Sequence, residues 1–176
     1  GASAAGKEVT ASTCILAAAV AGYVHSVIQA DRTSYTTDIV ERMQMRGSAF
    51  AAENWRETGR LPLPAQYLLE TGRLVAPART GFQDRLISNW AFNSKNSPSG
   101  TDFERIGLTE ILVNPDHLYT AVTSERRTPV FQALNADRAV SQSCLGCHNA
   151  HPNSPKGDFK PQDVMGGILS IIPLPQ

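Results

Sequence analysis

Residues 117–140 read HLYTAVT-SERRT-PVFQALNADRAV, two apolar segments joined by a charged turn. The outer segments, 117–123 and 129–140, are rich in β-branched, aromatic and aliphatic residues, as strands are. The turn between them, 124–128, has a length of about five residues, which is suitable for a hairpin loop. The pattern therefore predicts a β-hairpin of two antiparallel strands.

Other elements are predicted on both sides of the hairpin. Strand-like runs occur at 81–92 and 166–174. Thr101 and Glu104 have the spacing of a capping box, in which each side chain accepts a hydrogen bond from the other residue's backbone N–H. This box predicts a helix from Thr101 to about Asn114.

The first third of the chain is expected to be mainly helical. Residues 9–46 predict one long helix or a bent pair, with room for a kink at Gly22. Steps of three and four residues between His25 and Met43 place an apolar stripe on one face of this helix. A short second helix is predicted at 64–71.

The order of elements is helices, strand, helix, hairpin, loop and strand. Strands that are neighbours in sequence favour an antiparallel sheet, and a long helix beside such a sheet makes an α+β fold. The length of 176 residues predicts a single domain, 1–176, whose sheet comes from residues 81–176.

Composition excludes several classes of protein. The chain has 16 Lys or Arg and 16 Asp or Glu, and this balance argues against a nucleic-acid-binding protein. The longest apolar run, 14–22, has about half of the ~20 residues that a membrane-spanning helix needs. The N-terminus lacks the pattern of an intact signal peptide, so we expect a mature exported protein or a piece cut from a longer one. Three cysteines are too few for a disulfide scaffold.

Two of these cysteines form the motif Cys144-Leu145-Gly146-Cys147-His148, which is the C-x-x-C-H attachment sequence of a c-type haem. In that chemistry each thiol adds to one haem vinyl group, and the histidine gives an imidazole nitrogen to the iron. Gly146 is expected to allow a tight turn. By chance the pattern would occur in roughly one of a thousand such sequences.

Two other interpretations of the motif were considered. A thioredoxin-like C-x-x-C would open a long helix in a βαβ unit, but residues 149–155 contain two prolines and two asparagines. The other interpretation is that the motif has no function and consists of two inert cysteines beside a surface histidine.

The surrounding sequence gives a more specific indication. The segments concerned are 144–160 and 163–167, with weaker matches at 34–36, 86–90, 96–98 and 102–105. Over about residues 25–174 the chain resembles a family of haem c-containing PAS-like sensor domains, which occur in periplasmic parts of bacterial chemoreceptors, histidine kinases and nucleotide cyclases and as free-standing proteins. The resemblance implies a PAS-like antiparallel sheet with a long N-terminal helix and a haem loop between the last strands. It implies one covalent haem c, attached at Cys144, Cys147 and His148.

The sixth iron ligand is left open by the sequence, and it varies within the family. Met43, on the apolar stripe of the long helix, is the leading protein candidate. The alternative is an open site, where the iron binds water or a small gas in place of a side chain. Lys156 and Lys160 are preferred as partners of the haem propionates because they share the haem loop, and Trp90 is a candidate pocket residue. The remaining candidate ligands are Met45, His25, Cys14, Tyr35, His117, His151 and Met165.

Two functions fit these features. The first is a periplasmic or otherwise extracytoplasmic sensor, in which redox state or a diatomic gas changes the iron ligation and the long helix passes on the signal. The alternative is a monohaem c-type cytochrome that transfers electrons. No catalytic arrangement is recognisable, so an enzyme is not expected. The expected partners are a diatomic ligand or redox partner, a membrane-bound signalling protein and a second copy of the chain in a homodimer.

Overall fold

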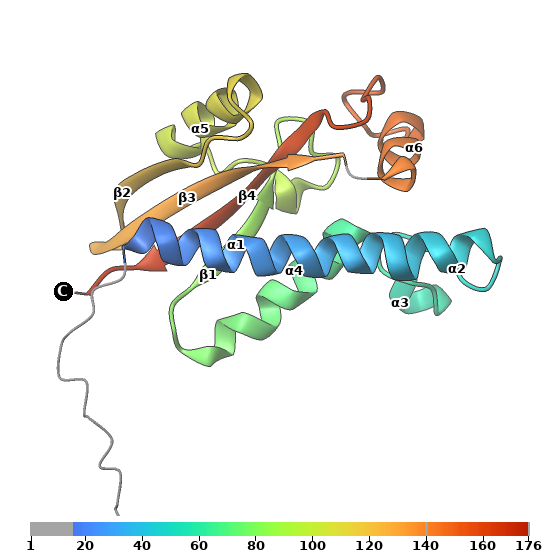
Figure 1. The fold of residues 1–176 in the computed structure, drawn as a ribbon, viewed down its shortest axis with the longest axis horizontal. Helices are drawn as coiled ribbons and strands as arrows, with labels where there is room; N and C mark the ends of the chain where they lie inside the picture. The colour runs from blue at the N-terminus through green and yellow to red at the C-terminus, as the bar shows by residue number, and fades with distance from the viewer. Residues whose placement is uncertain (1–15, 140, 176) are drawn as a thin grey trace, which may run out of the picture.

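The computed structural model describes residues 16–139 and 141–175 (Figure 1). Four strands are present: β1 (Gln83–Ile87), β2 (Tyr119–Glu125), β3 (Thr128–Arg138) and β4 (Val164–Pro173). The α-helices are α1 (Ala17–Ser34), α2 (Arg42–Met45), α3 (Trp55–Thr58), α4 (Pro64–Val75), α5 (Asp102–Val113) and α6 (Gln142–Ala150). A π-helix, η1 (Tyr35–Glu41), joins α1 to α2, and two 3-10 turns are η2 (Ala76–Ala78) and η3 (Ser94–Asn96).

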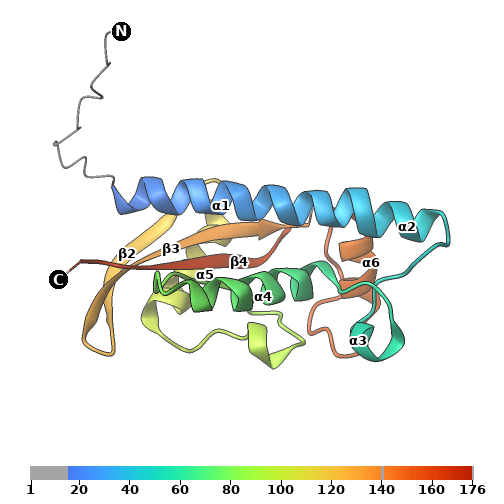
Figure 2. The same ribbon diagram turned by 90° about the horizontal axis from the view of Figure 1, so that it is seen from below.

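The strands form one antiparallel sheet in the order β1-β4-β3-β2. Helix α1 lies along one face of the sheet and α5 along the other (Figure 2). Successive residues of a strand point to opposite faces, so Leu134 and Leu169 join the core beneath α5, whereas the fully buried Ala133 and Ile168 point to the α1 face. The predicted α+β, PAS-like fold with a long N-terminal helix is confirmed.

The hairpin is confirmed, but its predicted loop of about five residues is wrong. Strands β2 and β3 pair up to Glu125 and Thr128, so only Arg126 and Arg127 form the turn. Their φ angles are 47° and 72°, in the left-handed region. Two central residues of positive φ match the right-handed twist of the strands, which explains why the shorter turn closes this hairpin.

Helix α5 confirms half of the predicted capping box. The Thr101 hydroxyl accepts a hydrogen bond from the Glu104 backbone N–H at 3.3 Å. The Glu104 carboxylate does not return to Thr101. It accepts instead from the Ser99 backbone N–H and from Arg85 at 3.1 Å, and this second partner anchors the start of the helix to β1.

The long N-terminal helix differs from the prediction in its geometry. It is continuous through Gly22, without a kink there, and runs from Ala17 to Met45. Its middle part, η1, is π-helical, so each turn contains more residues than in an α-helix. The predicted start at residues 9–15 lies outside the described residues.

Three further elements have other limits than the sequence predicted. The short helix predicted at 64–71 is confirmed and extends to Val75. The strand predicted over 81–92 is limited to Gln83–Ile87, and the residues after it form an irregular segment. The predicted haem loop lies between β3 and β4 as expected, but its first part is the helix α6.

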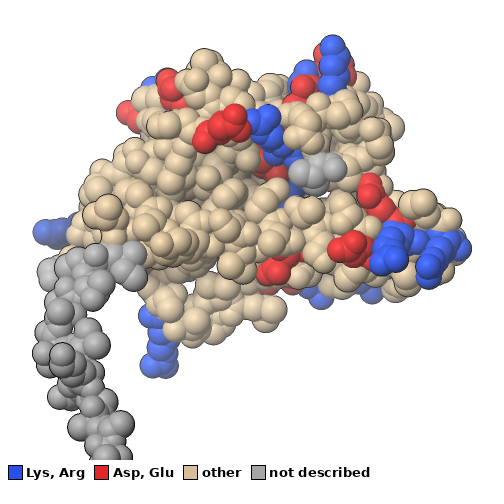
Figure 3. All heavy atoms as spheres, viewed as in Figure 1, with Lys and Arg blue, Asp and Glu red and all other residues tan. Residues whose placement is uncertain are grey.

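The outward face of α1 carries few charged side chains (Figure 3). Tyr23 and Val27 are exposed along this helix, and Leu16 is exposed directly before it. No helix within the described residues is long and apolar enough to cross a membrane. The homodimer expected from the apolar stripe stays a prediction.

Candidate cofactor site

A cavity of about 780 Å³ lies between α6 and the helix formed by α1, η1 and α2. We call it the α6 cavity. Its volume is within the range of about 300–1,000 Å³ typical of cofactor and ligand pockets. The N-terminal part of α4, the segment after β1 and the end of β3 complete its walls. Among the lining residues are Arg32, Val40, Gln44, Glu53, Trp90, Phe92, Asp137, Arg138, Cys144, Cys147, His148, His151 and Met165.

Helix α6 brings the motif residues to this cavity. Ser141 caps the helix, because its hydroxyl accepts from the Cys144 backbone N–H at 3.2 Å. Residues three and four positions apart share one face of a helix, so Cys144, Cys147 and His148 all line the α6 cavity. Both cysteines are free thiols. The tight turn expected at Gly146 is wrong, since this residue lies within the helix and a side chain there would meet no neighbour within 4 Å.

The His148 imidazole is held between two aromatic rings. Its ring centroid lies 5.0 Å from that of Phe92 and 5.8 Å from that of Phe159. Burial lowers the pKa of His148, and the nearby Asp137 charge opposes this shift. Its Nδ1 is buried and makes no hydrogen bond in the described structure. A neutral imidazole that can ligate iron, beside two free thiols that can add to vinyl groups, fits the requirements of a covalently attached haem.

The end of β3 contributes a buried ion pair. Arg32, on α1, contacts both carboxylate oxygens of Asp137, and its Nη2 donates to Oδ2 at 3.0 Å. Only 8% of Arg32 and 4% of Asp137 are exposed. Both residues line the α6 cavity. The Arg32 Nε is also buried and has no hydrogen-bond partner in the described structure.

The segment after β1 forms a further wall of the cavity. The Ser88 hydroxyl donates to the Met165 backbone oxygen at 2.6 Å and accepts from the Trp90 backbone N–H at 3.0 Å. The Trp90 indole meets Phe159 edge to face, with centroids 5.6 Å apart. Trp90, predicted as a pocket residue, does line the α6 cavity.

The two lysines expected to meet the propionates do not line the cavity. Lys156 pairs with Asp158, and its Nζ lies 5.0 Å from the centroid of the Phe159 ring. Lys160 is exposed. The cations that the structure brings to the cavity are Arg32 and Arg138. Arg32 had a recognisable signal, since it is a charged residue within the apolar stripe of the long helix.

Met43, predicted as a metal ligand, is 37% exposed and is absent from the cavity wall. This conformation therefore does not support it as the sixth ligand. The prediction assumed α-helical steps of three and four. The wider turns of η1 rotate the following residues around the helix axis, so Val40 and Gln44 line the cavity in place of Ile39 and Met43.

The other candidate ligands separate into two groups. Met45, His25, Tyr35 and His117 do not line the α6 cavity, whereas His151 and Met165 do. Cys14 lies outside the described residues.

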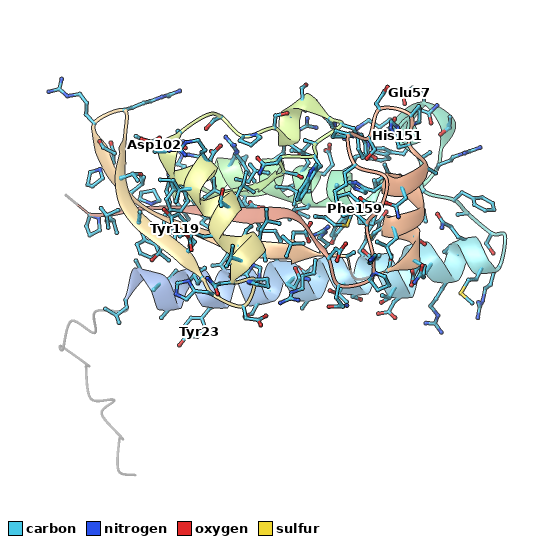
Figure 4. All side chains as sticks on the ribbon, turned by 90° about the horizontal axis from the view of Figure 1, so that it is seen from above. Tyr23, Glu57, Asp102, Tyr119, His151 and Phe159 are labelled. Carbon is cyan, nitrogen blue, oxygen red and sulfur yellow. The ribbon has the colours of Figure 1, made fainter. Side chains whose placement is uncertain are left out.

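His151 lies near α3 and α6 (Figure 4), and both of its ring nitrogens have partners. Its Nδ1 accepts from the Asn153 backbone N–H at 3.1 Å, and its Nε2 lies 3.2 Å from Glu53 Oε1. The ring also stacks on Phe92 at 4.4 Å. Met165 is buried in the wall and packs in a hydrophobic cluster with Leu145 and Phe159.

The fold and the site define an α+β protein with a Cys-Cys-His face in a cofactor-sized cavity, and comparison with known proteins agrees with this class. The Tll0287-like family model matches residues 10–173, so the chain belongs to the Tll0287-like family. The crystal structure of the cyanobacterial heme-protein Tll0287 is similar, with a TM-score of 0.55 and 18% identity over 92% of this chain and 99% of that chain. At this identity the likeness shows the fold. No curated protein matches the chain.

Proposed function

We propose that this protein is a monohaem c protein of the periplasm or another extracytoplasmic compartment, and that it is a sensor of redox state or of a diatomic gas. The observation that carries the proposal is the arrangement of Cys144, Cys147 and His148 on one face of α6, inside one cavity. The similarity to Tll0287, a cyanobacterial heme-protein, supports it.

Each residue of the motif has a distinct role in the proposal. The Cys144 and Cys147 thiols form the covalent attachment, and His148 is the axial ligand. When bound, the haem supplies an iron that exchanges one electron and binds a sixth ligand. The burial that keeps the His148 imidazole neutral favours its nitrogen as a ligand, because protonation would remove the lone pair.

The sensor role rests on the position of the N-terminal helix. Arg32, Val40 and Gln44 of this helix form part of the cavity wall, while Tyr23 and Val27 on the same helix are exposed. A change in iron coordination inside the cavity would therefore act on the N-terminal helix, and the exposed part of this helix is available to a partner. A sensor needs two states of different coordination, since a signal is a shift between them.

Haem attachment is tested by production of the chain with a c-type cytochrome maturation system. We expect one covalent haem by mass spectrometry and by the pyridine haemochrome spectrum. The Cys144→Ser/Cys147→Ser double variant loses it, and the matched control Cys14→Ser retains it. A wild-type chain that stays free of haem under these conditions would refute the proposal.

Absorption spectra of the ferric, ferrous and CO-treated protein separate the sensor from an electron carrier. A sensor is expected to show different coordination in these states, together with altered hydrogen exchange along α1 and η1. Identical six-coordinate spectra without CO binding would instead favour electron transfer. The observation that favours the sensor is that Met43 lies outside the cavity wall, since an iron without this ligand is open to a small gas.

A further inference from the structure

Stability of the fold does not by itself explain the buried ion pair between Arg32 and Asp137. Each charge loses its hydration when buried, and this penalty often equals or exceeds the attraction between them. Apolar residues of similar size would fill the same space with little loss of stability. A buried, bidentate pair beside a cofactor cavity therefore suggests a functional use of its charges.

The pair connects the two sides of the cavity. Arg32 lies in the last turn of α1, directly before the π-helix η1. Asp137 lies at the end of β3, where the pairing with β4 shifts register between Asp137 and Arg138. Four residues later Ser141 caps α6, the helix that carries the cysteines. Because both charges line the cavity, they form a short link between the N-terminal helix and the haem-binding segment.

The electric field of the pair reaches the motif residues. Cys144, Cys147 and His148 line the same cavity as Arg32 and Asp137, so a group held by the motif would interact electrostatically with both charges. In a site of low dielectric constant such interactions are stronger than in water.

We propose that the Arg32–Asp137 pair couples the oxidation state of the cofactor iron to the N-terminal helix. This inference rests on the proposed haem c function. When an external reductant gives one electron to the iron, the site loses one positive charge, and no bond to the pair forms or breaks. Arg32 favours the reduced state, because its positive charge repels the extra charge of the oxidised state. Asp137 favours the oxidised state for the opposite reason.

The two residues should therefore move the reduction equilibrium in opposite directions. Arg32→Gln leaves the Asp137 charge alone and is expected to disfavour reduction. Asp137→Asn leaves the Arg32 charge alone and is expected to favour reduction. We expect about a tenfold change in each equilibrium constant, which corresponds to about 59 mV for one electron. The double variant removes both charges, and we expect its potential to return close to that of the wild type.

The experiment is a redox titration of the haem-loaded chain with dithionite and ferricyanide, followed by the visible absorption of the haem. Arg32→Lys retains the positive charge and should retain the potential. The matched control is Arg85→Gln, because Arg85 pairs with the buried Glu104 but does not line the cavity. A purely structural role would lower stability in both single variants without shifting their potentials in opposite directions. Equal potentials, or shifts in the same direction, overturn the inference.

A second measurement needs only the wild type and the double variant, which keeps the test decisive if a single variant does not fold. Amide hydrogen exchange around Arg32 and η1 should differ by about fivefold or more between the ferric and ferrous wild type. The difference should be lost in the double variant. Equal exchange in the two oxidation states of the wild type would overturn the inference. A wild-type chain without covalent haem would instead overturn the proposed function itself.

Discussion

Gly166 is the residue whose substitution tests the packing behind the cavity wall. It follows Met165 in β4 and faces the end of β1. A Cβ atom at this position would lie 2.5 Å from the Ile87 backbone oxygen and 3.0 Å from the Ser88 Cβ. Because the nearer obstacle is backbone, it cannot rotate away as the end of a long side chain does. Gly166→Ala must therefore push β1 and β4 apart.

The size of the effect follows from these distances. Ordinary contact begins at 3.4 Å, so the end of β1 must retreat by about 0.9 Å. Overpacking of this kind costs about 1–3 kcal/mol. The alanine recovers about 0.4–1 kcal/mol by restricting the unfolded chain. We expect a net loss of about 1–2 kcal/mol, which for a chain of this length lowers the Tm by about 2–8 °C.

The same displacement should reach the site. Ser88, next to the clash, holds the Met165 backbone oxygen and the Trp90 backbone N–H. Retreat of β1 lengthens the first of these hydrogen bonds and moves the Trp90 part of the cavity wall. Thermal unfolding followed by circular dichroism gives the stability, and Trp90 fluorescence reports the wall, with Trp55 as a constant background.

Gly22→Ala is the matched control for Gly166→Ala. Gly22 lies within α1, and a side chain there would meet nothing within 4 Å. The higher helix propensity of alanine is expected to stabilise this variant by about 1 kcal/mol. If Gly166→Ala were as stable as the wild type while Gly22→Ala behaved as expected, the clash argument would be refuted.

Four further predictions concern three side chains. Ser141→Ala removes the cap of α6 and should cost about 1 kcal/mol, seen as faster hydrogen exchange of the Cys144 amide; unchanged exchange would contradict the capping role. Tyr35→Phe loses the hydrogen bond to the Pro62 carbonyl at 2.7 Å and should cost about 0.5–1.5 kcal/mol in urea unfolding. In the wild type, spectrophotometric titration should give Tyr35 a pKa of about 12, since burial raises it. Burial lowers the pKa of His25 below 6.5, so its neutral form stabilises the fold above that pH and the contribution is lost as the pH falls; His25→Gln should flatten this acid-side decline, and an identical decline would refute the assignment.

The sequence predicted those elements that local patterns determine. The hairpin is specified by strand-forming residues on both sides of a charged turn, and α5 by the cap at Thr101, and both signals act between residues close in sequence. The turn at Arg126 and Arg127 was missed because arginine is uncommon at two successive positions of positive φ. The pairing of the strands overcame that local preference.

In the candidate site, too, one part was predicted from the sequence and another part was not. Cys144, Cys147 and His148 were identified together because they form the C-x-x-C-H haem-attachment sequence, whereas the helix α6 that brings them to one face was not predicted. The opposite wall depends on η1, and nothing in the spacing of the apolar residues reveals that a helix changes from α to π. Once its turns widen, the residues predicted to face the site move to the surface, as Met43 does.

The sequence indicated that Arg32 is unusual, but only the fold shows its partner. A charge among the apolar residues of a stripe must either reach solvent or find a buried partner of opposite sign. The chain offers 16 acidic residues, and nothing local distinguishes Asp137, which is 105 positions away. Only the packing of α1 against the sheet brings the end of β3 to this arginine. The contact that completes the pair is therefore the contact that closes the cavity, and for this reason a change of charge inside the cavity bears directly on the attachment of the N-terminal helix to the sheet.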